Sequence, residues 1–177
     1  MKRLIILLAV VAATMTFSSP KASAQTIPFS QGDIMATAYA GVPDFATIVI
    51  PPVGIGAQYG IKAFGGGDYG VLGVGGAADF GLTSYYDGYS RKMFLPFQIS
   101  AFASYNYFFT DSFGVHAKSG LGLYLNKYYS YASISYFPLS YYEFIGVDYF
   151  FNPNFGVTAE VGYSALSYLH VGINYVF

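Results

Sequence analysis

The last eleven residues of the chain, Ser167-Tyr-Leu-His-Val-Gly-Ile-Asn-Tyr-Val-Phe177, decide how the rest of the sequence is interpreted. Every second residue, counted back from Phe177 to Leu169, is apolar. The residues between them are mixed in character and include Asn174 and His170. An alternation with a period of two predicts a β-strand with two different faces. Here the apolar face suits lipid, and the mixed face suits the lumen of a narrow barrel.

The opposite end of the sequence is typical of a secretory signal peptide. Met1-Lys2-Arg3 is a positive segment, residues 4–13 are apolar, and Ala22-Ser23-Ala24 matches an A-x-A cleavage site. The apolar segment is too short to span a bilayer as a helix. We therefore expect residues 1–24 to be a cleaved signal peptide and residues 25–177 to form one mature domain.

The composition is unusual for a soluble domain. Charged residues make up 10% of the chain, where about 25% is ordinary, and aromatic residues make up 20%. Loss of Lys2, Arg3 and Lys21 with the signal peptide leaves five basic residues against nine acidic ones, a net charge of −4. This balance gives no reason to expect a nucleic-acid partner. After the signal peptide, apolar residues are dispersed in alternation and form no run long enough for a membrane helix.

Alternating segments recur along the mature chain and predict eight strands, at residues 33–41, 53–62, 69–84, 97–107, 115–125, 139–150, 155–163 and 167–177. Residues 42–52 contain three prolines and are expected to form a loop, as are residues 84–92, 126–136 and 164–166. Short turns are expected at residues 65–68, 110–112 and 152–154. An even number of strands, with short turns on one side and longer loops on the other, predicts an all-β fold, an antiparallel transmembrane β-barrel of eight strands.

An internal repeat supports this interpretation. Tyr107-Phe-Phe-Thr-Asp-Ser-Phe-Gly-Val115 matches Tyr149-Phe-Phe-Asn-Pro-Asn-Phe-Gly-Val157 at six of nine positions. Each copy reads as the end of one strand, a short polar turn and the start of the next strand, with aromatic residues on both sides. Short periplasmic turns with an interfacial aromatic girdle have this pattern. The alternative is a pair of similar hairpin turns in any antiparallel sheet.

The C-terminal Phe, with Tyr two residues before it, resembles the C-terminal signature of bacterial outer-membrane barrels. Together with the segment Pro51-Pro-Val-Gly-Ile-Gly-Ala-Gln-Tyr-Gly-Ile61 and the two aromatic turns, it makes the whole mature chain similar to the small eight-stranded outer-membrane β-barrel domain family typified by outer-membrane protein X. The resemblance implies a porin-like membrane protein of the Gram-negative envelope, located in the outer membrane. It implies less about function, because the family includes structural proteins, adhesins and a few lipid-modifying enzymes.

The sequence offers little catalytic chemistry. It has no metal-ligand spacing, no phosphate-binding glycine loop and no Cys. His116 and Ser119 are close in sequence, but alternation places them on opposite faces of their strand, where they cannot cooperate as base and nucleophile. We therefore predict that the protein is not an enzyme and has no catalytic residues, cofactor or metal site.

Polar residues on the inward face predict a cluster in the lumen. Lys118 and Glu160 occupy equivalent positions in the two copies of the repeat, and a hairpin closed at Ala165 brings His170 opposite Glu160. The interior of an eight-stranded barrel is filled by side chains, so polar groups there must pair with one another or with trapped water. We expect a structural plug, with a proton path as the alternative. The full set of cluster residues predicted is Lys118, Glu160, His170, His116 and Asp79.

The same alternation assigns other residues to each face. Lys62 and Asp148 are also predicted to point inward. Strict alternation would place Glu143 against lipid near the middle of the membrane, which is unfavourable for a carboxylate. A β-bulge at Ile145-Gly146 is therefore predicted, with Glu143 inward and Tyr142 and Phe144 against lipid. The residues predicted to point outward are Ile55, Tyr59, Leu72, Ile99, Leu121, Leu123, Val161, Val171 and Ile173.

The external loops are rich in Tyr, which provides large contact area at low entropic cost. They form a candidate contact surface for an extracellular ligand or a cell surface, the alternative being an outer aromatic girdle with ordinary loop filling. We predict a monomer in contact with outer-membrane lipid, with a structural role and adhesion as a further one. The alternatives are a narrow pore for small solutes, a lipid-modifying enzyme and a soluble ligand-carrying barrel. The candidate contact residues are Tyr85, Tyr86, Tyr89, Arg91, Tyr128, Tyr129 and Tyr131.

Overall fold

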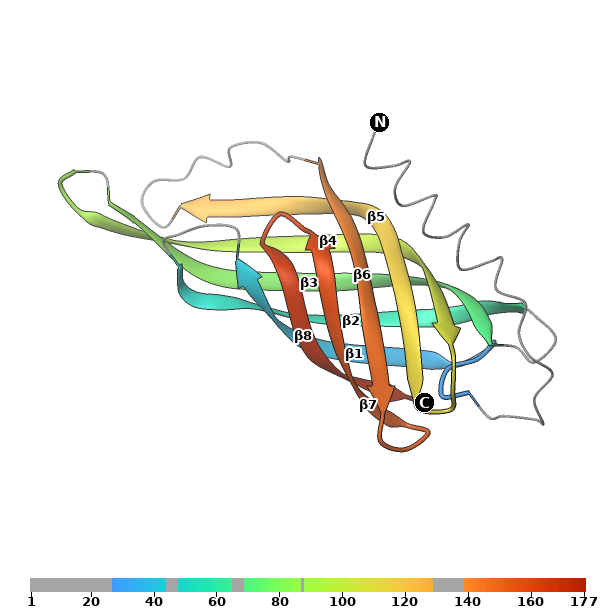
Figure 1. Cartoon of the computed structure of the whole chain (residues 1–177). Helices are drawn as coiled ribbons and strands as arrows, with labels where there is room; N and C mark the ends of the chain where they lie inside the picture. Colours follow the sequence, from blue (N-terminus) through green and yellow to red (C-terminus); the bar gives the residue numbers. More distant parts are fainter. Residues whose placement is uncertain (1–26, 44–47, 65–68, 87, 129–138) are drawn as a thin grey trace.

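The computed structural model describes residues 27–43, 48–64, 69–86, 88–128 and 139–177, which form a closed antiparallel β-barrel of eight strands (Figure 1). Each strand pairs with the next in the sequence, and the last pairs with the first. The predicted fold class is therefore confirmed, while the predicted signal peptide lies outside the described residues. The strands are β1 Ile34–Pro43, β2 Ile48–Phe64, β3 Gly70–Tyr86, β4 Arg91–Phe108, β5 Phe113–Tyr128, β6 Leu139–Phe150, β7 Phe155–Tyr163 and β8 Ser167–Val176.

No helix within the described ranges is long and apolar enough to cross a membrane.

The boundaries of β6 and β7 match the prediction, whereas β2 to β5 extend further than the sequence indicated. Tyr86 pairs with Arg91, so most of the predicted loop at 84–92 is hairpin, and the turn contains Gly88 with a φ of +91°. The predicted loop at 42–52 is also wrong in part, because residues 48–52 belong to β2. Pro51 and Pro52 are accommodated by a shift of register against β3, since proline cannot donate to the ladder. Residues 65–68 and 129–138 lie outside the described parts of the chain.

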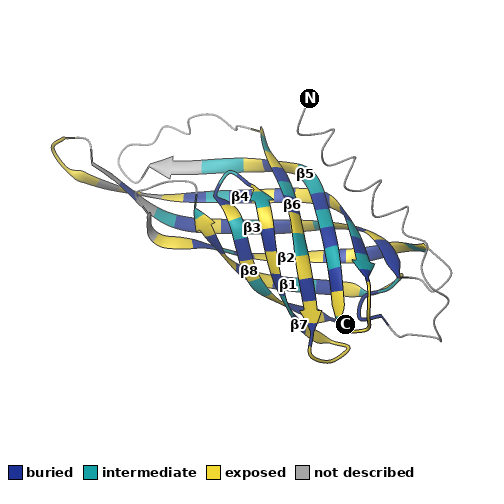
Figure 2. Cartoon of the chain, in the orientation of Figure 1, coloured by how far each residue is buried: buried dark blue, intermediate teal, exposed yellow. Residues whose placement is uncertain are grey.

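The two faces of the barrel wall alternate along every strand, as Figure 2 shows. The outward face is apolar, and all nine residues predicted to point outward are exposed. The inward face holds most of the buried polar groups, among them Gln58, Asn106 and Asn174. This distribution is the inverse of a water-soluble sheet protein, whose apolar face is buried.

Lys62 does not point inward as predicted. The register between β2 and β3 shifts at Ile61, so that Gly60 pairs with Gly73 and Lys62 pairs with the outward-facing Leu72. Ile61 and Lys62 are therefore both exposed, as expected of a β-bulge, which adds one residue to one strand. The ammonium group of Lys62 lies 5.2 Å from the centre of the Phe64 ring, close to the turn-side end of the barrel.

The bulge predicted at Ile145-Gly146 is absent, and the orientation predicted for Glu143 is wrong. The registers of β6 with β5 and with β7 run without a shift through Gly146. Tyr142 and Phe144 are buried in the lumen, and Glu143 lies half-buried on the outward face. Glu143 pairs with Tyr163, the last residue of β7, so it lies at the loop-side edge of the wall and not at its middle. Its carboxylate is therefore close to water, where its cost is smaller.

A segment before β1 closes the turn-side end of the barrel, which the sequence analysis did not anticipate. Ile27 and Phe29 are buried in an apolar cluster with side chains from the barrel wall. The backbone N–H of Gly32 donates to the carbonyl oxygen of Gly60 at 2.9 Å, and a Cβ at Gly60 would overlap the carbonyl oxygen of Ser30. The lack of a side chain at Gly60 thus lets the segment dock. The wall residues of this cluster are Met35, Tyr69, Val71, Phe108, Phe150 and Val176.

We call the buried side chains of Ile27 and Phe29 the apolar plug. Replacement of Phe29 tests how much this plug contributes to stability. Phe29 is 0% exposed, and truncation of a buried Phe to Ala costs about 3–5 kcal/mol. We expect Phe29→Ala to lower the free energy of unfolding by about 3 kcal/mol, measured by urea titration of the folded barrel in lipid vesicles. Phe151→Ala is the matched control, because Phe151 is exposed at the β6–β7 turn. An equal loss for both variants would contradict the assignment of Phe29 as the plug.

Candidate functional site: a hydrogen-bonded network in the lumen

Strand register places the residues at the centre of the lumen in one row. His116 of β5 pairs with Gly146 of β6, Gly146 with Glu160 of β7, and Glu160 with His170 of β8. A Cβ at Gly146 would lie 2.7 Å from Nε2 of His116. The missing side chain on β6 therefore lets the imidazole of His116 reach across that strand to Glu160. Gly146 serves close packing, and not the bulge that the sequence suggested.

Glu160 is the centre of the network and is 3% exposed. Its Oε1 accepts a hydrogen bond from Nζ of Lys118 at 2.5 Å and lies 2.9 Å from Nε2 of His116. Its Oε2 lies 3.2 Å from Nδ1 of His170. A buried carboxylate is tolerated only when it is paired and hydrogen-bonded, and three partners on two other strands meet that need.

The network continues from His116 toward the turn side. Nδ1 of His116 lies 2.6 Å from Oδ2 of Asp148, whose other oxygen accepts a hydrogen bond from Asn174 at 2.7 Å. Thr37 of β1 donates to the Asn174 side-chain oxygen at 2.7 Å. When His116 is an imidazolium, both ring nitrogens donate to carboxylates. The positive charges of His116 and Lys118 then balance the negative charges of Glu160 and Asp148.

Aromatic rings enclose the network. The His170 ring is stacked between Tyr39 and Phe144, with ring centres 4.2 and 4.1 Å away. The Lys118 ammonium lies 5.5 Å from the centre of the Phe102 ring, which stacks in turn on Tyr142. The side chains of Lys118 and His170 are therefore packed against aromatic rings, which fill the space around them.

Asp79 is buried in the lumen, but among the described residues it makes no hydrogen bond to Glu160. Its Oδ1 accepts a hydrogen bond from the hydroxyl of Tyr39. Tyr39 stacks on His170, so Asp79 is linked to the cluster through that ring. The structure therefore brings Lys118, Glu160, His170 and His116 into direct contact and places Asp79 one residue away.

The end of the lumen opposite Phe29, on the side of the predicted external loops, is covered by the segment that connects β7 to β8. This end is called the loop side. The side-chain oxygen of Gln98, on β4, accepts a hydrogen bond from the backbone N–H of Ala165 at 2.9 Å. Leu166 and Ser167 of the same turn are buried, and Ser167 Oγ lies 2.5 Å from Nε2 of His170. The polar network thus lies between this turn and the apolar plug at the other end.

The contact between Ser167 and His170 was not predicted from the sequence. Ser167, His170 and Glu160 are hydrogen-bonded in the order of a nucleophile, base and orienting acid. Ser167 is 1% exposed, so the hydroxyl is not accessible to a substrate, and the contact acts as packing inside the lumen. By alternation, the inward position before His170 is Tyr168 and not Ser167. The contact of Ser167 with His170 therefore becomes visible only in the geometry of the β7–β8 hairpin.

Among the described residues, no group of three or more His, Cys, Asp or Glu is arranged to hold a metal ion.

The candidate contact surface is described only in part. Tyr89 is 96% exposed in the β3–β4 turn, and Arg91 Nε donates to the Ser84 hydroxyl at 3.0 Å. Three more of the candidate residues belong to β3 or β5, but their side chains lie outside the described set: Tyr85, Tyr86 and Tyr128. The last two, Tyr129 and Tyr131, fall outside the described residues altogether.

Several solved structures share the architecture of this chain. A de novo designed transmembrane β-barrel matches with a TM-score of 0.54 and 18% identity, covering 84% of this chain and 98% of the design. Ail, the attachment invasion locus protein of Yersinia pestis, solved with the heparin analogue sucrose octasulfate, matches with a TM-score of 0.53 and 16% identity over 83% of this chain and 99% of Ail. The N-terminal β-barrel domain of OprF from Pseudomonas aeruginosa gives 0.50 and 15%, over 83% and 98%.

The chain therefore has the fold of the small eight-stranded transmembrane β-barrels. Among the matched structures is the outer membrane protein Ail in a phospholipid bilayer nanodisc, which agrees with the predicted resemblance to small outer-membrane barrels. No protein-family model and no curated protein sequence matches the chain.

A double-mutant cycle tests the ion pair at the centre of the network. Removing one partner of a buried pair leaves the other charge uncompensated and costs about 3–5 kcal/mol. We expect Lys118→Met and Glu160→Gln each to lower the free energy of unfolding by that amount in urea titrations. The double variant should lose less than the sum of the two single losses, because neither charge is then left without its partner. Additive losses would show that the two side chains do not interact.

Proposed function

We propose that the protein is a monomeric, non-enzymatic outer-membrane barrel with a plugged lumen, whose main role is structural. The observation that carries the proposal is the inversion of the wall, with an apolar outward face around a polar, hydrogen-bonded interior. In water, the exposure of the nine apolar residues of the outward face, such as Ile55 and Val171, would be unfavourable. In lipid, the same face is the stable one.

Strand lengths and aromatic residues support a membrane location. β7 has nine residues and β8 has ten, which matches the roughly 9–11 residues of a tilted strand that crosses a bilayer. At the turn side, edge-to-face Tyr–Phe pairs recur at the ends of β4, β6 and β8, with ring centres 4.8 to 5.4 Å apart. Aromatic girdles of this kind mark the interface between membrane and water. The pairs are Tyr107–Phe109, Tyr149–Phe151 and Tyr175–Phe177.

The interior favours a plug over a pore or a soluble carrier. A pore needs an open path, whereas the lumen holds the Glu160 network between the Phe29 plug and the β7–β8 turn. A soluble carrier would need an apolar interior. Polar groups along the lumen instead bond to one another, as Ser104 does by donating to Gln58 at 2.5 Å. This arrangement supports a barrel that conducts no solute.

Two measurements on the purified barrel test this proposal. On a detergent gel, we expect the unboiled protein to migrate differently from the boiled protein, because a closed barrel resists unfolding by detergent alone. In planar bilayers, we expect no stepwise conductance above that of protein-free membranes. Extraction of the protein in buffer without detergent would reject the membrane location, and steady single-channel currents would reject the plugged lumen.

Adhesion through the external loops is the second candidate role. In Figure 1 the β3–β4 hairpin projects well beyond the β7–β8 turn, and its tip carries the exposed Tyr89. A projecting tip with an aromatic side chain and the nearby Arg91 suits contact with a partner surface, because Tyr and Arg are enriched where proteins bind.

Substitution at the tip tests adhesion. We expect Tyr89→Ala combined with Arg91→Ala to reduce the attachment of barrel-bearing cells to cultured epithelial cells several-fold. Tyr141→Ala is the control, since Tyr141 is exposed on the outward face of β6, away from the hairpin. Unchanged attachment after the double substitution would argue against a role of this hairpin in adhesion.

A further inference from the structure

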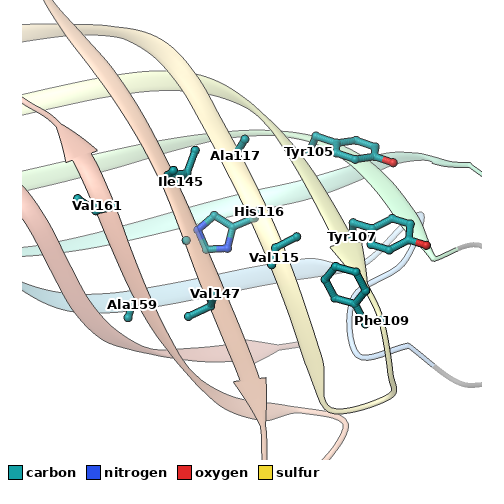
Figure 3. A pocket seen from close by; sticks show the side chains of 11 residues that line it. Tyr105, Tyr107, Phe109, Val115, His116, Ala117, Ile145, Val147, Ala159 and Val161 are labelled. Carbon is teal, nitrogen blue, oxygen red and sulfur yellow. The ribbon is translucent and has the colours of Figure 1, made fainter. Parts of the chain in front are cut away.

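A hollow lies on the outward face of the wall formed by β5, β6 and β7, and Figure 3 shows its lining. Its volume is about 590 Å³, within the range of small-molecule sites. Short side chains form its floor, with Ala117 from β5 and Ala159 from β7. The rings of Tyr105 and Tyr107 on β4, and of Phe109 just after it, form one side. The hollow is therefore an apolar groove along the lipid-facing wall, here called the β5–β7 groove.

A polar row closes the loop-side end of this groove. Ser119 pairs with Glu143, and Glu143 pairs with Tyr163, across β5, β6 and β7. All three side chains continue the outward rows that line the groove, because Glu143 precedes Ile145 and Val147 on the same face of β6. Paired residues on one face have Cβ atoms about 4.5–5.5 Å apart. One acidic residue and two hydroxyl-bearing residues therefore lie side by side, one row beyond the apolar lining of the groove.

Glu143 differs from every other acidic residue of the described strands. Asp79, Asp148 and Glu160 point inward and have hydrogen-bond partners there. Glu143 points outward, and no hydrogen bond of its carboxylate is present among the described residues. At the edge of the wall the cost of this half-buried carboxylate is smaller than at mid-membrane, and a positively charged partner would offset it further.

We propose that the β5–β7 groove and the Ser119–Glu143–Tyr163 row together bind one membrane lipid whose headgroup carries a protonated amine. An acyl chain lies in the groove, and the ammonium donates to the Glu143 carboxylate. A charge-assisted hydrogen bond in this partly dry setting is stronger than a neutral one. The inference rests on the proposed membrane location.

Charge favours a lipid over a second copy of the chain. Two barrels that meet through this face would bring their Glu143 carboxylates together, and like charges repel. The basic residues described as exposed on the strands are Lys62, at the turn-side end, and Arg91, in the β3–β4 hairpin, where its Nε donates to Ser84. Neither lies beside Glu143 in the strand pairing. A zwitterionic lipid supplies a positive group at the level of the polar row and an apolar chain below it.

A second hollow on the outward face supplies a matched comparison. It has a volume of about 770 Å³ and is formed mainly by β1 to β4 and β8, with Ala36, Ala57 and Ala78 in its lining. No acidic or basic side chain lines it. This second hollow should therefore hold lipid chains without preference for the headgroup.

Native mass spectrometry of the purified barrel in detergent tests the inference. Phosphatidylethanolamine, which has an amine, and phosphatidylglycerol, which has none, are added in separate titrations with matched acyl chains. We expect one phosphatidylethanolamine per barrel to be retained about tenfold more tightly than phosphatidylglycerol, the ratio that one charge-assisted hydrogen bond supplies. Glu143→Gln should abolish that ratio, and Ala159→Leu, which fills the groove, should weaken binding of both lipids. Ala57→Leu, which fills the second hollow, should change neither result.

Three results would overturn the inference. They are equal retention of the two lipids by the unaltered barrel, an unchanged ratio in Glu143→Gln, and a loss in Ala57→Leu as large as that in Ala159→Leu. Each variant is first checked for a shift on unboiled detergent gels. A barrel that shows the gel shift but no lipid preference rejects this inference alone. A chain that neither shifts nor binds lipid rejects the membrane location as well.

Discussion

The charge of Glu160 has to be compensated inside a barrel whose outward face is apolar, and much of the interior follows from that constraint. Glu160 is 3% exposed, so its carboxylate needs partners from the protein. Lys118, His116 and His170 supply these partners from β5 and β8. Gly146 makes the contact with His116 possible, because any side chain on β6 at that height would occupy the path.

The residues at the two ends of the lumen cover this network. The turn-side end is closed by apolar residues of the segment before β1, and the loop-side end by a turn bonded to Gln98. A hydrogen bond is stronger in a low dielectric than in water, provided that every group is satisfied. Both closures therefore strengthen the hydrogen bonds of Glu160 that they cover.

Two predictions from the sequence failed for the same reason. Lys62 was predicted to point inward, and a β-bulge was predicted close to Glu143. The extra residue of the bulge was thus placed in β6, whereas the structure has it in β2. A bulge changes the phase of alternation by one residue, and nothing in the alternation itself shows where the phase changes. In β2 the site is fixed by the docking of Ser30 against Gly60, a contact between segments that are distant in sequence.

By itself, the sequence determined the number of strands, the nine outward-facing apolar residues and the aromatic turns, because a period of two and the repeat of Tyr107–Val115 are local properties. It also placed Glu160 and Lys118 at one height, since equivalent repeat positions lie at equal distances from their turns. The tertiary structure decided which inward residues touch. Thr37 bonds to Asn174 across 137 positions of sequence, and only closure of β1 on β8 sets that register. Alternation fixes a residue's face, whereas its partner depends on the stagger of the closed barrel, which is a property of all eight strands together.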